Sequence, residues 1–255
     1  MLELMNLSAG YDRQDMIRDI SLSFQPGRLY TIVGRNGCGK STLLKACAGL
    51  LPAHGGSILL DGKELSSYAP MERACRISYL SQSRNTPGIT VERLVEHGRY
   101  PRLSSPRRLS LEDRQAVENA LERMQLEPLR HKNLHDLSGG ERQRVYIAML
   151  LAQDAPVLLL DEPTTYMDIE HQLSLLELLR DLKAEGKTII MVLHDLQQAM
   201  KISDEIIVMD DGRIAAASAP NDILSSGILE RVFRVRIEVI GDARGCVLNM
   251  EKPRR

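Results

Sequence analysis

The sequence predicts an α/β fold with a mostly parallel central sheet covered by helices on both faces. Three short apolar runs are typical of strands buried on both sides: Leu29–Val33, Val157–Leu160 and Thr188–Leu193. An amphipathic stretch from about residue 169 to 185 separates the last two runs, and its spacing predicts a helix. Strands that alternate with helices favour parallel pairing, because each helix crosses back over the sheet.

The first sixty residues predict strands, turns and one helix. Apolar and polar residues alternate over Leu2–Leu7 and Ile20–Phe24, as expected of half-buried strands. Pro26-Gly27 predicts a turn, and Ser41–Leu51 has helical spacing. The run Ser57–Leu60 followed by Asp61-Gly62 predicts a strand that enters a hairpin.

The middle of the chain predicts a helical insert at about 84–152, and the tail is a C-terminal extension at about 221–255. Helical spacing covers 90–98 and 110–124, with a basic loop at 102–108 between them. The run at 206–209 predicts another strand, and the tail predicts a short helix followed by strands near 235–240 and 246–250. We expect one domain over residues 1–255, since domains of this size are common.

Composition excludes several classes of protein. The 255 residues include 33 basic and 34 acidic side chains, so no cationic field favours non-specific binding of nucleic acid. The apolar run Val145–Ala152 is far shorter than the ~20 residues of a membrane-spanning helix. Four cysteines show no C-x-x-C spacing and are too few for a disulfide scaffold in a chain of this length. We therefore expect a soluble, cytoplasmic chain without a secretion signal.

Residues 34–42 match the phosphate-binding pattern G-x-x-x-x-G-K-[ST], and this segment is called the phosphate loop below. It reads Gly34-Arg35-Asn36-Gly37-Cys38-Gly39-Lys40-Ser41-Thr42. Its glycines let consecutive N–H groups face phosphate oxygens, and the following helix adds its positive end. Lys40 would bridge the β- and γ-phosphates, and Ser41 would bind Mg²⁺. A coincidental glycine-rich turn is the alternative, but the position between a buried strand and a helix favours phosphate binding.

A second motif, Val157–Glu162, delivers two carboxylates to the end of a buried strand. Ligands bind at this end of strands in open α/β sheets. Asp161 would hold Mg²⁺ through water, and Glu162 would act as the general base on the attacking water. Surface acids at the end of a strand would be the better interpretation for this motif alone. The phosphate loop favours the catalytic interpretation.

A third motif, Leu137–Arg144, places Ser138 before Gly139-Gly140, and these three residues are called the signature segment. Ser138 can cap the next helix, and the two glycines expose its first N–H groups, so a second anion site results. One nucleotide does not need two phosphate cradles in one subunit, unless the second serves the nucleotide of a partner. In isolation, an ordinary capped helix would be the simpler interpretation.

With these motifs the chain resembles the ATP-binding-cassette (ABC) ATPases over essentially its full length. The resemblance rests on six features in the order of that family: Gly34–Thr42, Gln82, Leu137–Arg144, Val157–Glu162, Asp168 and His194. It implies a P-loop NTPase fold with an antiparallel β subdomain and a helical insert. It also implies a head-to-tail homodimer with two ATP molecules, each between one phosphate loop and the partner's signature segment.

The resemblance also implies roles for four isolated residues. Gln82 contacts Mg²⁺ and reports the nucleotide state to a membrane partner, while Asp168 crosses the dimer seam. His194 contacts the γ-phosphate, and Tyr11 matches the aromatic residue that stacks on adenine. Three of them have a structural alternative: a polar loop residue for Gln82, a helix cap for His194, and packing at the sheet edge for Tyr11.

Several short strings resemble the branch of the family that serves importers of iron chelates, haem and cobalamin. Tyr166-Met167-Asp168 stands where many family members have Ala-Leu-Asp. The strings that resemble the branch are Thr164–Ile169 with His171-Gln172, His97–Pro101 and Leu193–Ala199. The resemblance implies the ATPase subunit of an importer, with ferric siderophores or related chelates as cargo.

Such a subunit would act at the cytoplasmic face of the cell membrane, as a peripheral protein on a separate permease. An extracytoplasmic substrate-binding protein would be an indirect partner. Three alternatives stay open: a soluble cassette ATPase acting on nucleic acid or ribosomes, an importer subunit for another cargo such as haem, cobalamin or a metal ion, and a non-catalytic nucleotide-binding module. Glu162 argues against the last, because it supplies the general base.

Overall fold

The computed structural model describes residues 1–12, 14–82, 85–103, 108–240 and 247–251. Its central sheet has the strand order β10-β9-β3-β8-β7-β6. All neighbouring strands in it are parallel except β10, which runs antiparallel to β9, so the predicted, mostly parallel sheet is confirmed. The strands are β3 (Leu29–Gly34), β6 (Ile77–Leu80), β7 (Val157–Asp161), β8 (Thr188–Val192), β9 (Glu205–Asp210) and β10 (Arg213–Ser218).

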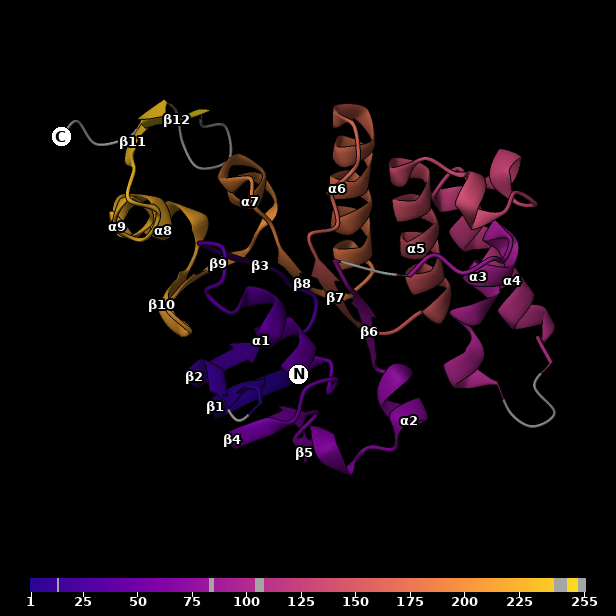
Figure 1. Ribbon diagram of the computed structural model, residues 1–255, viewed down its shortest axis with the longest axis horizontal. Coiled ribbons are helices and arrows are strands. Elements are labelled where there is room, and N and C mark those ends of the chain that lie inside the picture. The colour runs from indigo at the N-terminus through magenta and orange to yellow at the C-terminus, as the bar shows by residue number, and fades with distance from the viewer. Residues whose placement is uncertain (13, 83–84, 104–107, 241–246, 252–255) are drawn as a thin grey trace.

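Side chains that alternate along each central strand divide the hydrophobic core in two. On β3, Leu29 and Val33 join a cluster with residues of α5, α6 and α7, whereas Tyr30 and Ile32 join one with β1, β2 and α1. These helices are α1 (Lys40–Cys47), α5 (Gly139–Gln153), α6 (Ile169–Ala184) and α7 (Leu196–Ile202). Both faces of the sheet are therefore covered, as predicted (Figure 1).

A second, antiparallel sheet of order β2-β1-β4-β5 lies beside α1 (Figure 1). Its strands are β1 (Leu2–Tyr11), β2 (Gln14–Phe24), β4 (Ala53–Leu60) and β5 (Lys63–Glu64). The predicted hairpin after β4 is present, because Asp61 and Gly62 turn the chain with φ of 52° and 76°.

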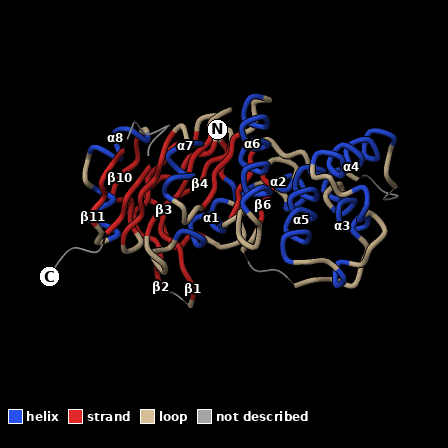
Figure 2. The backbone as a smooth tube through the Cα atoms, turned by 90° about the horizontal axis from the view of Figure 1, so that it is seen from above, coloured by secondary structure: helices blue, strands red, loops and turns tan. Residues whose placement is uncertain are grey.

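The helices α3 (Val91–His97), α4 (Leu111–Arg123) and α5 gather at one end of the molecule, opposite α8 (Pro220–Ser225) and α9 (Ile228–Phe233) (Figures 1 and 2). A buried ion pair joins them, since Arg99 Nε donates to Asp113 Oδ1 at 2.8 Å and Arg99 also donates to the carbonyl of Ala152 at 2.8 Å. This link connects the first turn of α4 to the last turn of α5.

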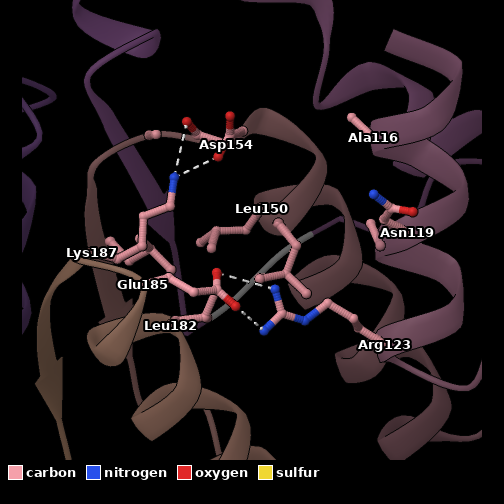
Figure 3. Close-up of a pocket in the computed structure, with 12 residues that line it drawn as sticks. Ala116, Asn119, Arg123, Leu150, Asp154, Leu182, Glu185 and Lys187 are labelled. Carbon is pink, nitrogen blue, oxygen red and sulfur yellow. Dashed lines mark hydrogen bonds and ion pairs between the residues drawn. The ribbon is translucent and has the colours of Figure 1, made fainter. Parts of the chain in front are cut away.

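A pocket of about 240 Å³ lies where α4 and α5 meet the end of α6 and the start of β8 (Figure 3). Leu150 and Leu182 are among its apolar lining, and two ion pairs lie at the pocket. Arg123 pairs with Glu185 at 2.8 Å, and Lys187 pairs with Asp154. The helical end is thus held to the central sheet partly by charged contacts.

Three local predictions need correction. The helix expected over 41–51 ends at Cys47, because Gly49 adopts a left-handed φ of 66° that a helix cannot continue. Strand β6 is additional to the predicted elements. The tail contains two helices rather than one, α8 (Pro220–Ser225) and α9 (Ile228–Phe233), separated at Gly227 with φ of 68°.

The tail then forms the two expected strands, β11 (Arg236–Ile240) and β12 (Val247–Glu251), which pair antiparallel. Helix α2 (Pro70–Ala74) precedes β6. Parts of some predicted segments lie outside the described residues: 84, 104–107, 241–246 and 252–255. Within the described ranges, none of the helices has both the length and the apolar character required to traverse a membrane.

Candidate functional site

The phosphate loop connects the end of β3 to the start of α1. Gly39 has φ of 101°, and a Cβ there would lie 2.7 Å from Ile17 Cγ2, so only glycine fits. Lys40 is 6% exposed, and its ammonium donates to the carbonyls of Gly34 at 2.8 Å and Arg35 at 3.0 Å. The lysine charge is therefore held inside the loop.

Asp161 ends β7 directly beside the loop. It is 1% exposed, accepts a hydrogen bond from Ser41 Oγ at 3.0 Å, and lies 3.5 Å from the Tyr79 hydroxyl. Burial raises the pKa of the Asp161 carboxyl, and the hydrogen bond from Ser41 offsets part of this rise. The buried Asp161 carboxylate and the Ser41 hydroxyl therefore lie side by side at the carboxyl edge of the sheet.

Glu162 follows Asp161 and faces His194, which comes two residues after β8. His194 Nε2 lies 2.6 Å from Glu162 Oε1, and Thr165 Oγ1 donates to Glu162 Oε2 at 3.3 Å. The Glu162 side chain is 11% exposed and that of His194 is 49% exposed. Glu162 has φ of 53°, a left-handed conformation that is costly for a residue with a Cβ.

Lys40, Glu162 and His194 line one cleft of about 270 Å³, and Asp161 lies behind it, bonded to the lining residue Ser41. Its lining contains most of the predicted phosphate-loop residues together with the two catalytic candidates and Gln82. Met16, which reaches the cleft from β2, belongs to no motif and was not among the predicted site residues. The full lining is Met16, Asn36, Gly37, Gly39, Lys40, Ser41, Thr42, Gln82, Glu162 and His194. Cys38, although in the loop, is buried and belongs to the core cluster with α1.

Tyr11 lies at the end of β1, near α1. Its side chain is 44% exposed, and its hydroxyl accepts a hydrogen bond from Lys45 Nζ at 3.1 Å. Sequence analysis missed Lys45, which carries no motif signal beyond its place in the helix after the phosphate loop.

The signature segment forms the start of α5. Ser138 is exposed and caps the helix: its Oγ accepts from the Glu141 amide at 3.2 Å, and its own amide donates to Glu141 Oε2 at 2.7 Å. These bonds lower the pKa of Glu141. Gly139 and Gly140 pack on Tyr166, where a Cβ on Gly140 would lie 3.1 Å from the Tyr166 carbonyl.

The structure gives the signature segment a cavity different from the cleft at Lys40. Gly139 and Tyr166 line a cavity of about 380 Å³, which Gln82 also borders. Gln82 therefore lies at the edge of both cavities.

Asp168 lies next to Tyr166 and caps α6. It accepts hydrogen bonds from the His171 amide at 2.9 Å and meets His171 Nδ1 at 2.7 Å, and these contacts lower the pKa of its carboxyl. The Asp168 side chain is 67% exposed. An exposed, ionised carboxylate therefore stands beside the signature segment.

The phosphate loop, the two carboxylates at the end of β7 and the capped glycine pair define a nucleotide-hydrolysing cassette. The chain belongs to the ABC transporter family, whose model matches residues 17–165. It is 43% identical to the ferric enterobactin transport ATP-binding protein FepC of Escherichia coli (strain K12), over 92% of this chain and 88% of that protein. It is 39% identical to the iron(3+)-hydroxamate import ATP-binding protein FhuC of Bacillus subtilis (strain 168), over 95% of this chain and 91% of that protein.

A solved structure agrees with this assignment. The dimeric ATP-binding cassette MJ0796, in a post-hydrolysis state bound to ADP and Pi, superposes with a TM-score of 0.79. It is 26% identical and covers 86% of this chain and 99% of that chain. The predictions of an ABC-family ATPase and of the P-loop NTPase fold are confirmed.

Proposed function

We propose that this chain is the ATP-hydrolysing subunit of an ABC importer for ferric siderophores or related iron chelates. The observation that carries the proposal is the cleft in which Lys40, Ser41, Gln82, Glu162 and His194 meet. The cargo class rests on the relatives, because FepC is a ferric enterobactin transport protein and FhuC an iron(3+)-hydroxamate import protein.

The residues present fit a magnesium ion. The Ser41 hydroxyl and the Asp161 carboxylate lie 3.0 Å apart, and such hard oxygen donors are those that Mg²⁺ prefers. Ser41, Asp161 and Gln82 would hold the ion, which would neutralise charge on the phosphate oxygens. The raised pKa of Asp161 supports this assignment, because a buried carboxylate without a cation is costly.

Lys40 would bind the β- and γ-phosphates. Its ammonium already lies among loop carbonyls, so exchanging these partners for phosphate oxygens needs only a small movement of the side chain. The loop amides of residues 35–39, with the N-terminus of α1, would donate to the remaining oxygens.

Glu162 would accept a proton from the attacking water. Its contacts with His194 and Thr165 fix the carboxylate at the edge of the cleft. His194, half exposed at the same place, would then contact the γ-phosphate and stabilise its charge in the transition state.

The complete site would need two copies of the chain. Ser138, Gly139 and Gly140 would close over the nucleotide of the partner, with Asp168 beside them at the seam. The exposure of Ser138 and the separate cavity at Gly139 support this arrangement.

The dimer would act on a separate membrane permease, at the cytoplasmic face of the membrane. Gln82, at the edge of both cavities, would link nucleotide state to that permease. An extracytoplasmic binding protein would deliver the chelate without touching this chain. Tyr11 would stack on the adenine.

The substitution Glu162→Gln tests this function. We expect ATP binding to persist, the rate of hydrolysis to fall about 10²–10³-fold, and ATP to trap a dimer. Equilibrium ATP binding, phosphate release and the molecular mass with and without ATP provide the measurements. Glu177→Gln, on an exposed face of α6, is the matched control and should hydrolyse ATP normally.

Uptake of the cargo tests the second half of the proposal. Cells whose only copy carries Glu162→Gln should fail to take up radiolabelled iron as ferric enterobactin or as a ferric hydroxamate, while the Glu177→Gln control imports at least one. Normal hydrolysis by the Glu162 variant would refute the base assignment. If cells that lack the chain still take up both chelates, the assignment of ferric siderophores as the cargo is refuted.

A further inference from the structure

A lysine on the phosphate-loop helix holds the ring of Tyr11 by its hydroxyl. Lys45 Nζ lies 3.1 Å from the Tyr11 hydroxyl and 5.6 Å from the ring centroid. An ammonium that is so much closer to the oxygen lies beyond the hydroxyl end of the ring, not above its centre. Lys45 therefore holds the hydroxyl end of the ring and does not itself cover the ring faces.

The backbone at Tyr11 is also fixed. Gly10 is so close to the returning strand β2 that a Cβ there would lie 1.8 Å from the Gln14 carbonyl oxygen. Tyr11 pairs with Gln14 in the register of β1 and β2, so the direction in which its side chain leaves the sheet is set. The freedom that remains is rotation of the side chain, which the contact with Lys45 restrains.

Lys40 and Lys45 extend from the same helix in different directions. Five residues advance a helix by about 7.5 Å and turn it by about 140°. Lys40 accordingly reaches into the loop, whereas Lys45 reaches toward the end of β1. One rigid helix thus carries both the phosphate contact and the support for the ring.

We propose that Lys45 is a positioning residue for nucleotide binding, which holds Tyr11 in the orientation that stacks on the adenine ring. The proposal rests on the proposed function, since it requires ATP in the cleft. Lys45 itself touches Tyr11 rather than the nucleotide. Because Lys45 orders the Tyr11 ring before ATP binds, the binding free energy is not reduced by the cost of immobilising that ring.

Two other roles for Lys45 make different predictions. As a cation in the last turn of α1 it could serve only the helix dipole, and its removal would then lower stability without changing ATP affinity. Its charge also acts on Asp161, so it could influence the phosphate end of the site. Inorganic tripolyphosphate, which lacks the base, separates this last role from support of the ring.

The experiment is a double-mutant cycle on the full-length chain with Lys45→Met, Tyr11→Phe and the double variant. We expect each single change to raise the KM for ATP about two- to tenfold, which is the cost of ordering one side chain, with kcat within about twofold of wild type. The double variant should show no further increase, because both changes remove the same contact. Inhibition by tripolyphosphate should stay at the wild-type concentration in all three.

Two controls accompany the cycle. Lys45→Arg can still donate to the hydroxyl and should restore the wild-type KM. Lys63→Met removes a lysine of the edge strand β5 that lies 4.6 Å from the centroid of the Tyr68 ring, a lysine–tyrosine pair that does not line the cleft, and should leave KM unchanged. Thermal unfolding of each variant reports any general loss of stability.

Effects on KM that multiply in the double variant would overturn the proposal, as would an unchanged KM in Lys45→Met. Weaker inhibition by tripolyphosphate in Lys45→Met would also overturn it, since Lys45 would then act on the phosphates. Lys40→Ala tests the proposed function separately: it should lose both ATP and tripolyphosphate binding. If Lys40→Ala binds both normally, the function fails; if only the Lys45 results differ from expectation, the positioning role alone fails.

Discussion

The phosphate loop and the signature segment both present backbone amides at the start of a helix, but the molecule supports them differently. Lys40 and Asp161 are almost fully buried, and their contacts join the loop to a strand more than a hundred residues away in the chain. Ser138 is exposed and exchanges its hydrogen bonds with Glu141, one helical turn away. The hydrophobic core organises the first segment, whereas local capping organises the second.

The carboxyl groups of Asp161, beside the phosphate loop, and Glu141, beside the signature segment, have pKa values shifted in opposite directions. Burial raises the pKa of Asp161, while hydrogen bonds from Ser138 lower that of Glu141. The ionised Asp161 carboxylate is costly to bury and suits a nearby cation, whereas the ionised Glu141 carboxylate is stabilised by its hydrogen bonds with Ser138. This difference suits the site that we propose to be divided between two chains, in which one half holds the ligand and the other closes over it.

The largest expected effect tests this division directly. Ser138→Arg and Lys40→Ala should each lower ATP hydrolysis by about 10²-fold or more, because each disables one half of every site. Mixed dimers of the two variants should regain activity, since one of their two sites combines an intact loop with an intact signature segment. Phosphate release from purified mixed dimers provides the measurement.

Mixed dimers that form but stay inactive would contradict a site divided between two chains. The phosphate loop and the signature segment of one chain would then act on the same nucleotide. Dimers of each single variant, prepared in the same way, set the background rate.

A smaller effect should appear in the pH dependence of stability. The folded pKa of Asp161 lies above its ordinary 3.8, so its charge costs stability as pH rises through the folded pKa, and Asp161→Asn should be more stable than wild type at pH 7. The folded pKa of Glu141 lies below its ordinary 4.5, so its contribution exists above that value and is lost as pH falls through the folded pKa. Glu141→Ala should therefore lower the free energy of unfolding at pH 7, by about 0.3–1.5 kcal/mol.

Urea unfolding from pH 7 downward measures both differences, which should shrink as the carboxyl groups protonate. Glu141→Gln, which keeps a side-chain acceptor for the cap, should retain more stability than Glu141→Ala. A less stable Asp161→Asn variant at pH 7 would mean that its contacts outweigh the cost of burial.

The smallest effect concerns the contact between the helical end and the sheet. Arg123→Ala breaks the ion pair with Glu185 beside the pocket in Figure 3, and exposed pairs of this kind contribute about 0–1 kcal/mol. A double-mutant cycle with Glu185→Ala, repeated at high salt, measures the coupling, which should weaken with salt. A coupling that salt leaves unchanged would show that packing, not charge, joins the two parts.

The sequence predicts the central strands and the phosphate loop because their signals are local: continuous apolar runs and glycines at fixed spacing. Strand β6 escaped prediction because it is four residues long, and its assignment depends on parallel pairing with β7. Met16 and Lys45 escaped because their importance comes from the fold. Lys45 meets Tyr11 across 34 positions of sequence, and neither residue type nor spacing reveals that contact.

The backbone conformation of Glu162 has a consequence for the engineering of more stable variants. Its left-handed backbone, with φ of 53°, is one that glycine would adopt more readily, and a non-glycine residue there costs of order 1–3 kcal/mol. A search for thermostable variants would therefore tend to favour glycine at the position where the proposed mechanism needs a carboxylate. Under the proposed mechanism, thermal stability and the rate of ATP hydrolysis place opposite demands on residue 162. A screen for more stable variants should therefore also select for ATPase activity.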